Sequence, residues 1–240
     1  MLMDKTIGGE GEERVVRIAE GGVVLEGNLS RPEGARGVVL FAHGSGSSRH
    51  SPRNRYVARL LNEAKLATML LDLLTADEEA IDLLMAHLRF DIDLLAERLV
   101  GATDWLTRHP GTRDLRIGYF GASTGAGAAL VAATQRPQVV GAVVSRGGRP
   151  DLAGPVLPRV RAPTLLIVGG HDFQVIERNR AALAQLRCEK QLVIVPEATL
   201  LFEEPGALDE VARLARTWFE RHLMSAEARA TEASTPSVQQ

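Results

Sequence analysis

Six short apolar runs, separated by amphipathic stretches, constrain the fold of this 240-residue chain more than any other feature. The runs are Gly37–Ala42, Leu66–Leu71, Leu115–Phe120, Val139–Val144, Thr164–Val168 and Leu192–Val195. Continuous apolar runs of this length are typical of strands that are buried on both faces. Because helix-like segments lie between them, the pattern predicts an α/β fold with a mostly parallel sheet and helices on both faces.

The chain opens differently, with two strand-like runs at Val15–Ala19 and Val23–Leu29. Glu20-Gly21-Gly22 separates them, and a Gly-Gly pair between two such runs favours a tight hairpin. We therefore expect an antiparallel N-terminal hairpin at one edge of the sheet.

Five amphipathic or Ala-rich segments are expected to form the helices. Ser51-Pro52 has the order of a cap residue followed by proline in the first turn, and this helix should reach about Ala64. The other four segments are Asp91–Arg108, Ser123–Gln135, Val175–Arg187 and Pro205–Leu223. The length fits a single domain over residues 1–224. Residues 225–240 lack a periodic apolar face, so they are expected to be a disordered tail.

Composition excludes several classes of partner. The formal net charge is −2, which gives no electrostatic basis for binding nucleic acid. No apolar run approaches the length of a membrane span, and Met1–Glu10 lacks the apolar core of a secretory signal. We expect a cytoplasmic protein whose partner is a small molecule, with the oligomeric state left open.

Gly121-Ala122-Ser123-Thr124-Gly125 follows a predicted strand and precedes an Ala-rich helix. This is the G-x-S-x-G pattern in the strand–turn–helix context of a nucleophile elbow. The turn would present the Ser123 hydroxyl as a nucleophile, and the backbone N–H of Thr124 would stabilise a developing oxyanion. The alternative is that Ser123 only caps the helix.

A glycine-rich turn, His43-Gly-Ser-Gly-Ser-Ser48, follows the first buried strand. Such a turn can direct a second backbone N–H into the same site, and Ser45 is the favoured donor, with Gly44 beside it. A phosphate-binding loop is the rival interpretation, but the segment lacks the required Lys-Ser/Thr ending. His43 could be a base, although its position at a strand end favours a structural role.

Asp172 follows the strand Thr164–Val168, within Gly169-Gly-His-Asp172. An acid in this place suits the chain order of serine, acid and histidine in a catalytic triad. Its function would be to orient an imidazole and stabilise its charged form. The alternative is an aspartate that caps the following helix.

Taken together, these motifs resemble the dienelactone-hydrolase-like branch of the α/β-hydrolases, over about Val15–Leu223. Four segments carry the resemblance: Ala42–Ser48, Gly121–Gly125, Arg161–Asp172 and Phe202–Gly206. It implies the α/β-hydrolase fold and acyl transfer from a small ester or lactone to water. It implies neither a metal nor an organic cofactor.

The resemblance also implies a catalytic histidine in the loop after the last strand, where this chain has Leu200. No histidine lies between Asp172 and Glu220. A serine hydroxyl is a poor nucleophile without a positioned base. Loss of one triad member leaves only about 10³–10⁴-fold catalysis over water, so activity is expected to be impaired.

Three interpretations of Leu200 remain open. The chain is a weakened or inactive hydrolase, natural or engineered; or another histidine serves as the base, with His87 and His171 as candidates besides His43; or the site has become an apolar ligand pocket. In the third case Ile81, Leu83, Leu84 and Met85 would line a cavity together with Phe173 and Leu200. The alternative for Ile81–Met85 is one side of a short helix packed on the core.

Arg146 follows another predicted strand, at the sheet edge where α/β proteins bind ligands. Its guanidinium could bind a substrate carboxylate with two parallel hydrogen bonds. Equally, it could pair with Asp151 or Asp172 and be structural.

Overall fold

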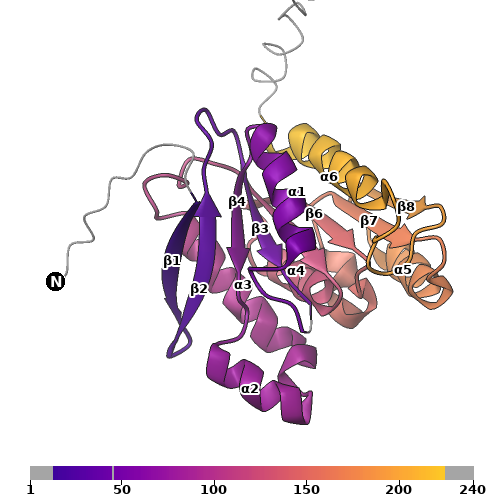
Figure 1. Cartoon of the computed structure of the whole chain (residues 1–240), viewed down its shortest axis with the longest axis horizontal. Helices are drawn as coiled ribbons and strands as arrows, with labels where there is room; N and C mark the ends of the chain where they lie inside the picture. Colours follow the sequence, from indigo (N-terminus) through magenta and orange to yellow (C-terminus); the bar gives the residue numbers. More distant parts are fainter. Residues whose placement is uncertain (1–12, 45, 225–240) are drawn as a thin grey trace, which may run out of the picture.

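The computed structural model describes residues 13–44 and 46–224, which form an eight-stranded sheet with helices on both faces (Figure 1). The strands lie in the order β1-β2-β4-β3-β5-β6-β7-β8. Their bounds are β1 Glu13–Glu20, β2 Val23–Ser30, β3 Val38–Ala42, β4 Ala67–Leu71, β5 Ile117–Ala122, β6 Val140–Arg146, β7 Thr164–Gly169 and β8 Lys190–Val195. From β4 to β8 every neighbouring pair is parallel. The predicted fold class is therefore confirmed.

The N-terminal hairpin is also confirmed. β1 and β2 pair antiparallel, with Glu20 opposite Val23, and β2 joins the parallel strands through antiparallel pairing with β4. Gly21 and Gly22 both have positive φ, 57° and 82°. A two-residue hairpin turn of type I′ requires positive φ at both positions, which explains the Gly-Gly pair.

Two helices cover one face of the sheet and three cover the other. α1 (Pro52–Glu63) and α6 (Ala207–Leu223) pack over a core that includes Phe41, Phe120 and Phe219. α3 (Ile92–Leu106), α4 (Thr124–Gln135) and α5 (Phe173–Gln185) pack against the opposite face. All five lie where helices were predicted, and Ser51 caps α1 by accepting a hydrogen bond from the backbone N–H of Asn54.

Three further elements fall outside those five predictions. They are the helix α2 (Ala76–Met85), the 3₁₀ turn η1 (Leu88–Phe90) and the 3₁₀ segment η2 (Pro150–Arg159). α2 projects from the lower end of the molecule in Figure 1, below the carboxyl ends of the parallel strands. None of the helices in the described part of the chain is long and apolar enough to cross a membrane.

One strand differs from its prediction. β8 was expected to be buried on both faces, but it is the last strand of the sheet and only Val195 is fully buried. An apolar run alone does not distinguish a central strand from an edge strand, because strand order is a tertiary property. The predicted tail, residues 225–240, lies outside the described residues.

Candidate active site

Ser123 lies on a sharp turn between β5 and α4. Its φ and ψ are 50° and −126°, a conformation that non-glycine residues rarely adopt. A methyl group on Gly121 would come within 2.5 Å of Ala126 Cα, and one on Gly125 within 2.2 Å of the Ala42 carbonyl oxygen. The two glycines are therefore required by the close approach of strand, helix and the neighbouring β3 turn.

The turn after β3 packs directly on this serine. A Cβ on Gly44 would come within 2.5 Å of Ser123 Cβ and 3.3 Å of its Oγ. Thr124, the first residue of α4, is buried beside them, and the Ser123 side chain makes no capping hydrogen bond with the helix. The geometry thus brings together Ser123, Thr124 and Gly44, whereas Ser45 lies outside the described residues.

Both ring nitrogens of His43 are engaged by the backbone. Nε2 accepts a hydrogen bond from the N–H of Leu73 at 3.2 Å, so Nδ1 carries the proton and donates to the Gly44 carbonyl at 2.9 Å. The ring is buried and fixes the position of the β3 turn relative to β4. In this arrangement His43 has no free nitrogen with which to deprotonate Ser123.

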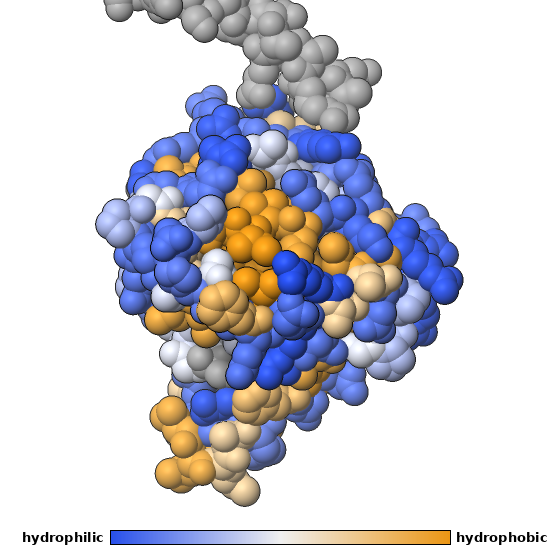
Figure 2. Space-filling view, turned by 90° about the vertical axis from the view of Figure 1, so that its right-hand side faces the viewer, coloured by the Kyte–Doolittle hydropathy of each residue, from blue (hydrophilic) through white to orange (hydrophobic). Residues whose placement is uncertain are grey.

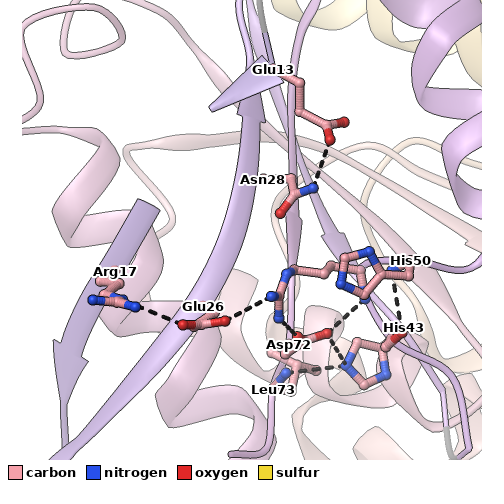
Figure 3. A network of polar contacts seen from close by, with 10 residues as sticks. Glu13, Arg17, Glu26, Asn28, His43, His50, Asp72 and Leu73 are labelled. Atoms are coloured by element: carbon pink, nitrogen blue, oxygen red, sulfur yellow. Dashed lines mark hydrogen bonds and ion pairs between the residues drawn. The ribbon is translucent and has the colours of Figure 1, made fainter. Parts of the chain in front are cut away.

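A polar network that the sequence did not predict also holds the turn after β3 in place (Figure 3). The backbone N–H of Arg49 donates to Asp72 at 2.6 Å, and its guanidinium pairs with both Asp72 and Glu26. Asp72 Oδ1 also lies 3.9 Å from His43 Nε2. These residues come from β2, the β3–α1 loop and the end of β4, so no local sequence pattern could have identified them.

Asp172 and His171 each have a partner other than Ser123. Asp172 caps α5 by accepting a hydrogen bond from the N–H of Val175 at 3.3 Å. The His171 ring is half exposed, and its Nε2 lies 3.3 Å from a carboxylate oxygen of Glu197. Among the residues that the structure describes, no side chain forms a hydrogen bond with the Ser123 hydroxyl. His87 is exposed at the start of η1, outside the site.

Leu200 lies in the loop that joins β8 to α6. This loop crosses the carboxyl ends of the neighbouring strands: a Cβ on Gly169, at the end of β7, would come within 2.4 Å of the Ala198 carbonyl oxygen. The Leu200 side chain is 41% exposed and reaches Gly147, just beyond the end of β6. Position 200 therefore lies at the carboxyl edge of the sheet, where the resemblance implies a histidine, and it carries an aliphatic side chain.

A pocket of about 230 Å³ opens beside the serine turn, beneath α2. Its lining includes the apolar side chains of four leucines and the charged side chains of Glu79, Asp82 and Arg89. Its lining residues are His43, Gly44, Gly46, Ser47, Ser48, Leu73, Leu74, Glu79, Asp82, Leu83, Arg89, Leu95 and Thr124.

The buried carboxylate of Asp82 fixes the wall of this pocket. Asp82 accepts hydrogen bonds from the Arg89 guanidinium at 2.5 Å and from the backbone N–H of Leu88 at 2.7 Å. Burial acts to raise the pKa of Asp82, but these donors outweigh it and hold the pKa below its ordinary value. The ionised Asp82 therefore ties the end of α2 to η1.

The pairing of Asp82 with Arg89 also explains why the expected apolar cavity does not form. Asp82 occupies the inner face of α2, so the apolar residues beside it point outward: Leu84 is 89% exposed and Met85 is 68% exposed. Of the cluster Ile81–Met85, only Leu83 contributes an apolar wall to the pocket. Phe173 is 72% exposed at the start of α5. The cluster thus neither lines a common cavity nor packs on the core.

Arg146 is buried at the end of β6 and pairs with neither predicted aspartate. Its Nη2 donates to Asn54 Oδ1 of α1 at 3.0 Å, while Arg149 takes Asp151 as its partner. Burial lowers the pKa of Arg146 to about 10, and the nearby charge of Arg53 acts in the same direction. The structure leaves this guanidinium without a carboxylate among the described residues.

Comparison with known proteins finds solved structures that are similar to most of this chain. A dienelactone hydrolase from Anabaena variabilis is 65% identical, with a TM-score of 0.87, and the match covers 90% of this chain and 100% of that one. A dienelactone hydrolase-like promiscuous phosphotriesterase from metagenomic libraries is 18% identical with a TM-score of 0.73, over 90% of this chain and 100% of that one, and supports the fold alone. No protein-family model matches.

Two Mycobacterium tuberculosis proteins are 58% identical over 208 residues, which is 87% of this chain. Their names contain the words "phosphoribosyl transferase". The matched region is only 46% of each of those proteins, so this chain spans less than half the length of these curated relatives.

Proposed function

The chain belongs to the dienelactone hydrolases of the α/β-hydrolase fold, and we propose that it cleaves small esters or lactones slowly, through an acyl-enzyme on Ser123. The observation that carries this proposal is the strained backbone of Ser123, with φ 50° and Gly44 packed on its side chain. Strain of about 1–3 kcal/mol at such a turn persists where the surrounding structure enforces it, commonly at active sites.

In the proposed reaction, Ser123 Oγ bonds to the substrate carbonyl carbon. The carbonyl oxygen becomes an oxyanion, which the backbone N–H of Thr124 and of the Gly44–Ser45 turn would stabilise. When the carbonyl re-forms, the bond to the alcohol oxygen breaks and that oxygen takes up a proton; the alcohol of an ester leaves, whereas the hydroxyl of an opened lactone stays attached to the acyl group. Water then attacks the acyl-enzyme, releases the acid and returns the proton to Ser123.

In this proposal, removal of the hydroxyl proton from Ser123 limits the rate of hydrolysis. In the described structure no imidazole accepts it, since His43 is bonded to Gly44 and Leu73 and His171 faces Glu197. Solvent must then take the proton, which removes the roughly 10²–10⁴-fold contribution of a general base. We therefore propose a slow hydrolase, with Asp172 as the acid of a triad that lacks its middle member.

The pocket beneath α2 suits a small apolar substrate group. Its volume is about 230 Å³, and Leu73, Leu74, Leu83 and Leu95 form its apolar part. The Asp82–Arg89 pair closes one wall. Since Arg89 is already paired, the described lining offers no free cation for a phosphoribosyl group, and we do not assign to this chain the activity in the relatives' names.

One observation favours a second candidate function. The replacement of the expected histidine by Leu200 would also suit a protein that binds an apolar ligand in this pocket without chemistry. In that case the strained turn at Ser123 would be retained from a catalytic ancestor, and the protein would bind small esters without cleaving them.

A fluorophosphonate probe and p-nitrophenyl acetate separate the two functions. We expect mass spectrometry to find the probe on Ser123, and Ser123→Ala to abolish both labelling and hydrolysis above background. Ser47→Ala is the matched control, because Ser47 lines the same pocket, and it should be labelled normally. Hydrolysis by the folded wild-type protein equal to that of Ser123→Ala would reject the enzyme and leave the binding protein.

A further inference from the structure

A second groove lies at the opposite end of the sheet from Ser123. Apolar side chains gather at the projecting lower end of Figure 2, where α2 lies beyond the carboxyl ends of the parallel strands. The second groove instead lies at the amino ends of β6, β7 and β8, and its volume is about 640 Å³. Cavities that bind small molecules commonly measure about 300–1,000 Å³. The groove is therefore large enough for such a ligand, and it shares no described lining residue with the pocket beside Ser123.

Three arginines line this groove, which we call the arginine groove: Arg159, Arg161 and Arg187. Arg159 and Arg161 lie close together at the junction of η2 and β7. β7 and β8 are parallel neighbours in which Thr164 lies opposite Lys190. Arg161 and Arg187 come shortly before these two residues in the chain, so the pairing of the strands brings both arginines to the same edge of the sheet.

In the described part of the chain, none of these three guanidinium groups has a carboxylate partner. Arginines elsewhere on the surface behave differently: Arg59 and Arg216, both more than half exposed, each pair with a glutamate four residues further along. The described lining of the groove contains no acidic residue. The acid nearest in sequence, Glu189, pairs with Arg221 at 2.8 Å. Cations gathered in one concavity without a counter-charge attract an anion.

A structural role accounts for only one of these cations. Arg187 follows the carboxyl end of α5, where a positive charge interacts favourably with the helix dipole. Arg159 and Arg161 lie outside the α-helices, so this explanation does not extend to them. The formal net charge of the chain is −2. The three arginines are therefore a local excess of positive charge and not part of a generally basic protein.

We infer that the arginine groove binds a small organic phosphate that carries two or more negative charges. Arginine suits this ligand because its planar guanidinium donates paired hydrogen bonds to phosphate oxygens. The rest of the lining includes Pro137, Pro158 and Val160. The carbon-rich part of the ligand would pack against these residues, which leaves the phosphates to the guanidinium groups.

Isothermal titration calorimetry of the full chain with ATP tests the inference, at about 0.02 M salt and without Mg²⁺, where charges are weakly screened. Inorganic triphosphate supplies the phosphate chain alone, and adenosine supplies the carbon-rich part without charge. We expect one ATP to bind per chain, triphosphate to bind more weakly and adenosine not to bind. About 0.5 M salt should weaken ATP binding at least about tenfold. Triphosphate binding as tight as that of ATP would overturn the organic part of the ligand.

Arg161→Gln should raise the dissociation constant for ATP at least about tenfold, because it removes a charge-assisted hydrogen bond. Arg178→Gln is the matched control. Arg178 of α5 is exposed, has no partner among the described residues and does not line the groove. Its replacement removes the same charge and should leave the constant unchanged. Circular dichroism and thermal unfolding verify that both variants are folded, and both should hydrolyse p-nitrophenyl acetate as the wild type does.

Cys188 provides a second, local measurement, since it is the only cysteine of the chain and lines the arginine groove. Burial raises the pKa of its thiol. A bound phosphate would raise this pKa further and shield the sulfur, so iodoacetamide should label Cys188 more slowly when ATP is present. The inference is overturned if ATP does not bind at low salt or if saturating ATP leaves the labelling rate unchanged. It is also overturned if folded Arg161→Gln and Arg178→Gln bind ATP equally well.

Discussion

Leu200 lies against Gly147 across the carboxyl ends of the sheet. A Cβ on Gly147 would come within 3.0 Å of Leu200 Cδ1 and 2.9 Å of its carbonyl oxygen, and Gly147 has a φ of 51°. The loop that in related hydrolases is expected to carry the catalytic histidine is therefore held close to β6. It places an aliphatic side chain where the proposed mechanism of Ser123 would need a base.

Leu200→His should restore a base to this site. We expect kcat/KM for p-nitrophenyl acetate to rise about 10²–10⁴-fold, the usual contribution of a general base. The pH profile should gain an inflection near the ordinary histidine pKa of about 6.5. Leu200→Gln is the control, because it adds polarity without an imidazole, and Asp172→Asn should reduce the gain. No increase in Leu200→His would mean that this loop does not face Ser123.

Gly44→Ala should damage the site specifically. The added methyl group would collide with Ser123 Cβ and displace the turn that we propose as the source of an oxyanion donor. Loss of one such donor typically lowers kcat about 10²–10³-fold, which steady-state kinetics on p-nitrophenyl acetate would detect. Gly111→Ala is the control, since its nearest neighbour is the His109 side chain at 3.2 Å. Equal kinetics in the two variants would contradict the proposed oxyanion turn.

Leu95→Ala should enlarge the pocket and change acyl preference. Leu95 and Leu99 are both buried on α3, but only Leu95 lines the pocket. Each truncation should cost about 2–5 kcal/mol of unfolding free energy, measured by urea denaturation. Only Leu95→Ala should increase hydrolysis of p-nitrophenyl butyrate relative to the acetate. A similar shift in Leu99→Ala would show that the effect comes from general loosening.

Acid should release α2 from η1. Because the pKa of Asp82 is lower in the folded protein than its ordinary value of 3.8, the unfolded chain binds this proton more tightly. The contribution of ionised Asp82 to the free energy of unfolding is therefore complete above the ordinary pKa. It is lost as the pH falls through the lower pKa of the folded state. Hydrogen exchange at residues 83–90 should keep its protection above about pH 4 and lose it as the pH falls further. Asp82→Asn should already lack this protection at neutral pH. If its hydrogen exchange depends on pH as in the wild type, Asp82 does not hold α2 to η1.

Arg146→Met tests the buried guanidinium. Because burial lowers the pKa of Arg146 and it has no carboxylate partner among the described residues, an apolar replacement should keep or raise the unfolding free energy. Asn54→Ala should instead lower it by about 1–3 kcal/mol, since it leaves the cation without its acceptor. If Arg146 binds a substrate carboxylate, Arg146→Met would raise KM for a carboxylate-bearing ester and not for a neutral one.

The sequence alone determined the features that depend on local chemistry. Buried apolar runs located the strands, Gly21-Gly22 located the hairpin, and Gly121–Gly125 located the strained serine turn, because each is encoded by residues next to one another. The absence of a histidine between Asp172 and Glu220 was equally evident, and it is the feature on which the proposed slow chemistry depends.

Tertiary structure alone decided which groups meet. The Arg49–Asp72–Glu26 network, the Asn54 partner of Arg146 and the edge position of β8 join segments far apart in the chain, so no local pattern encodes them. The orientation of α2 is the clearest case. Its apolar residues suggested a cavity lining, but the pairing of Asp82 with Arg89 turns the carboxylate inward and Leu84 out to solvent, because a buried charge must keep its partner.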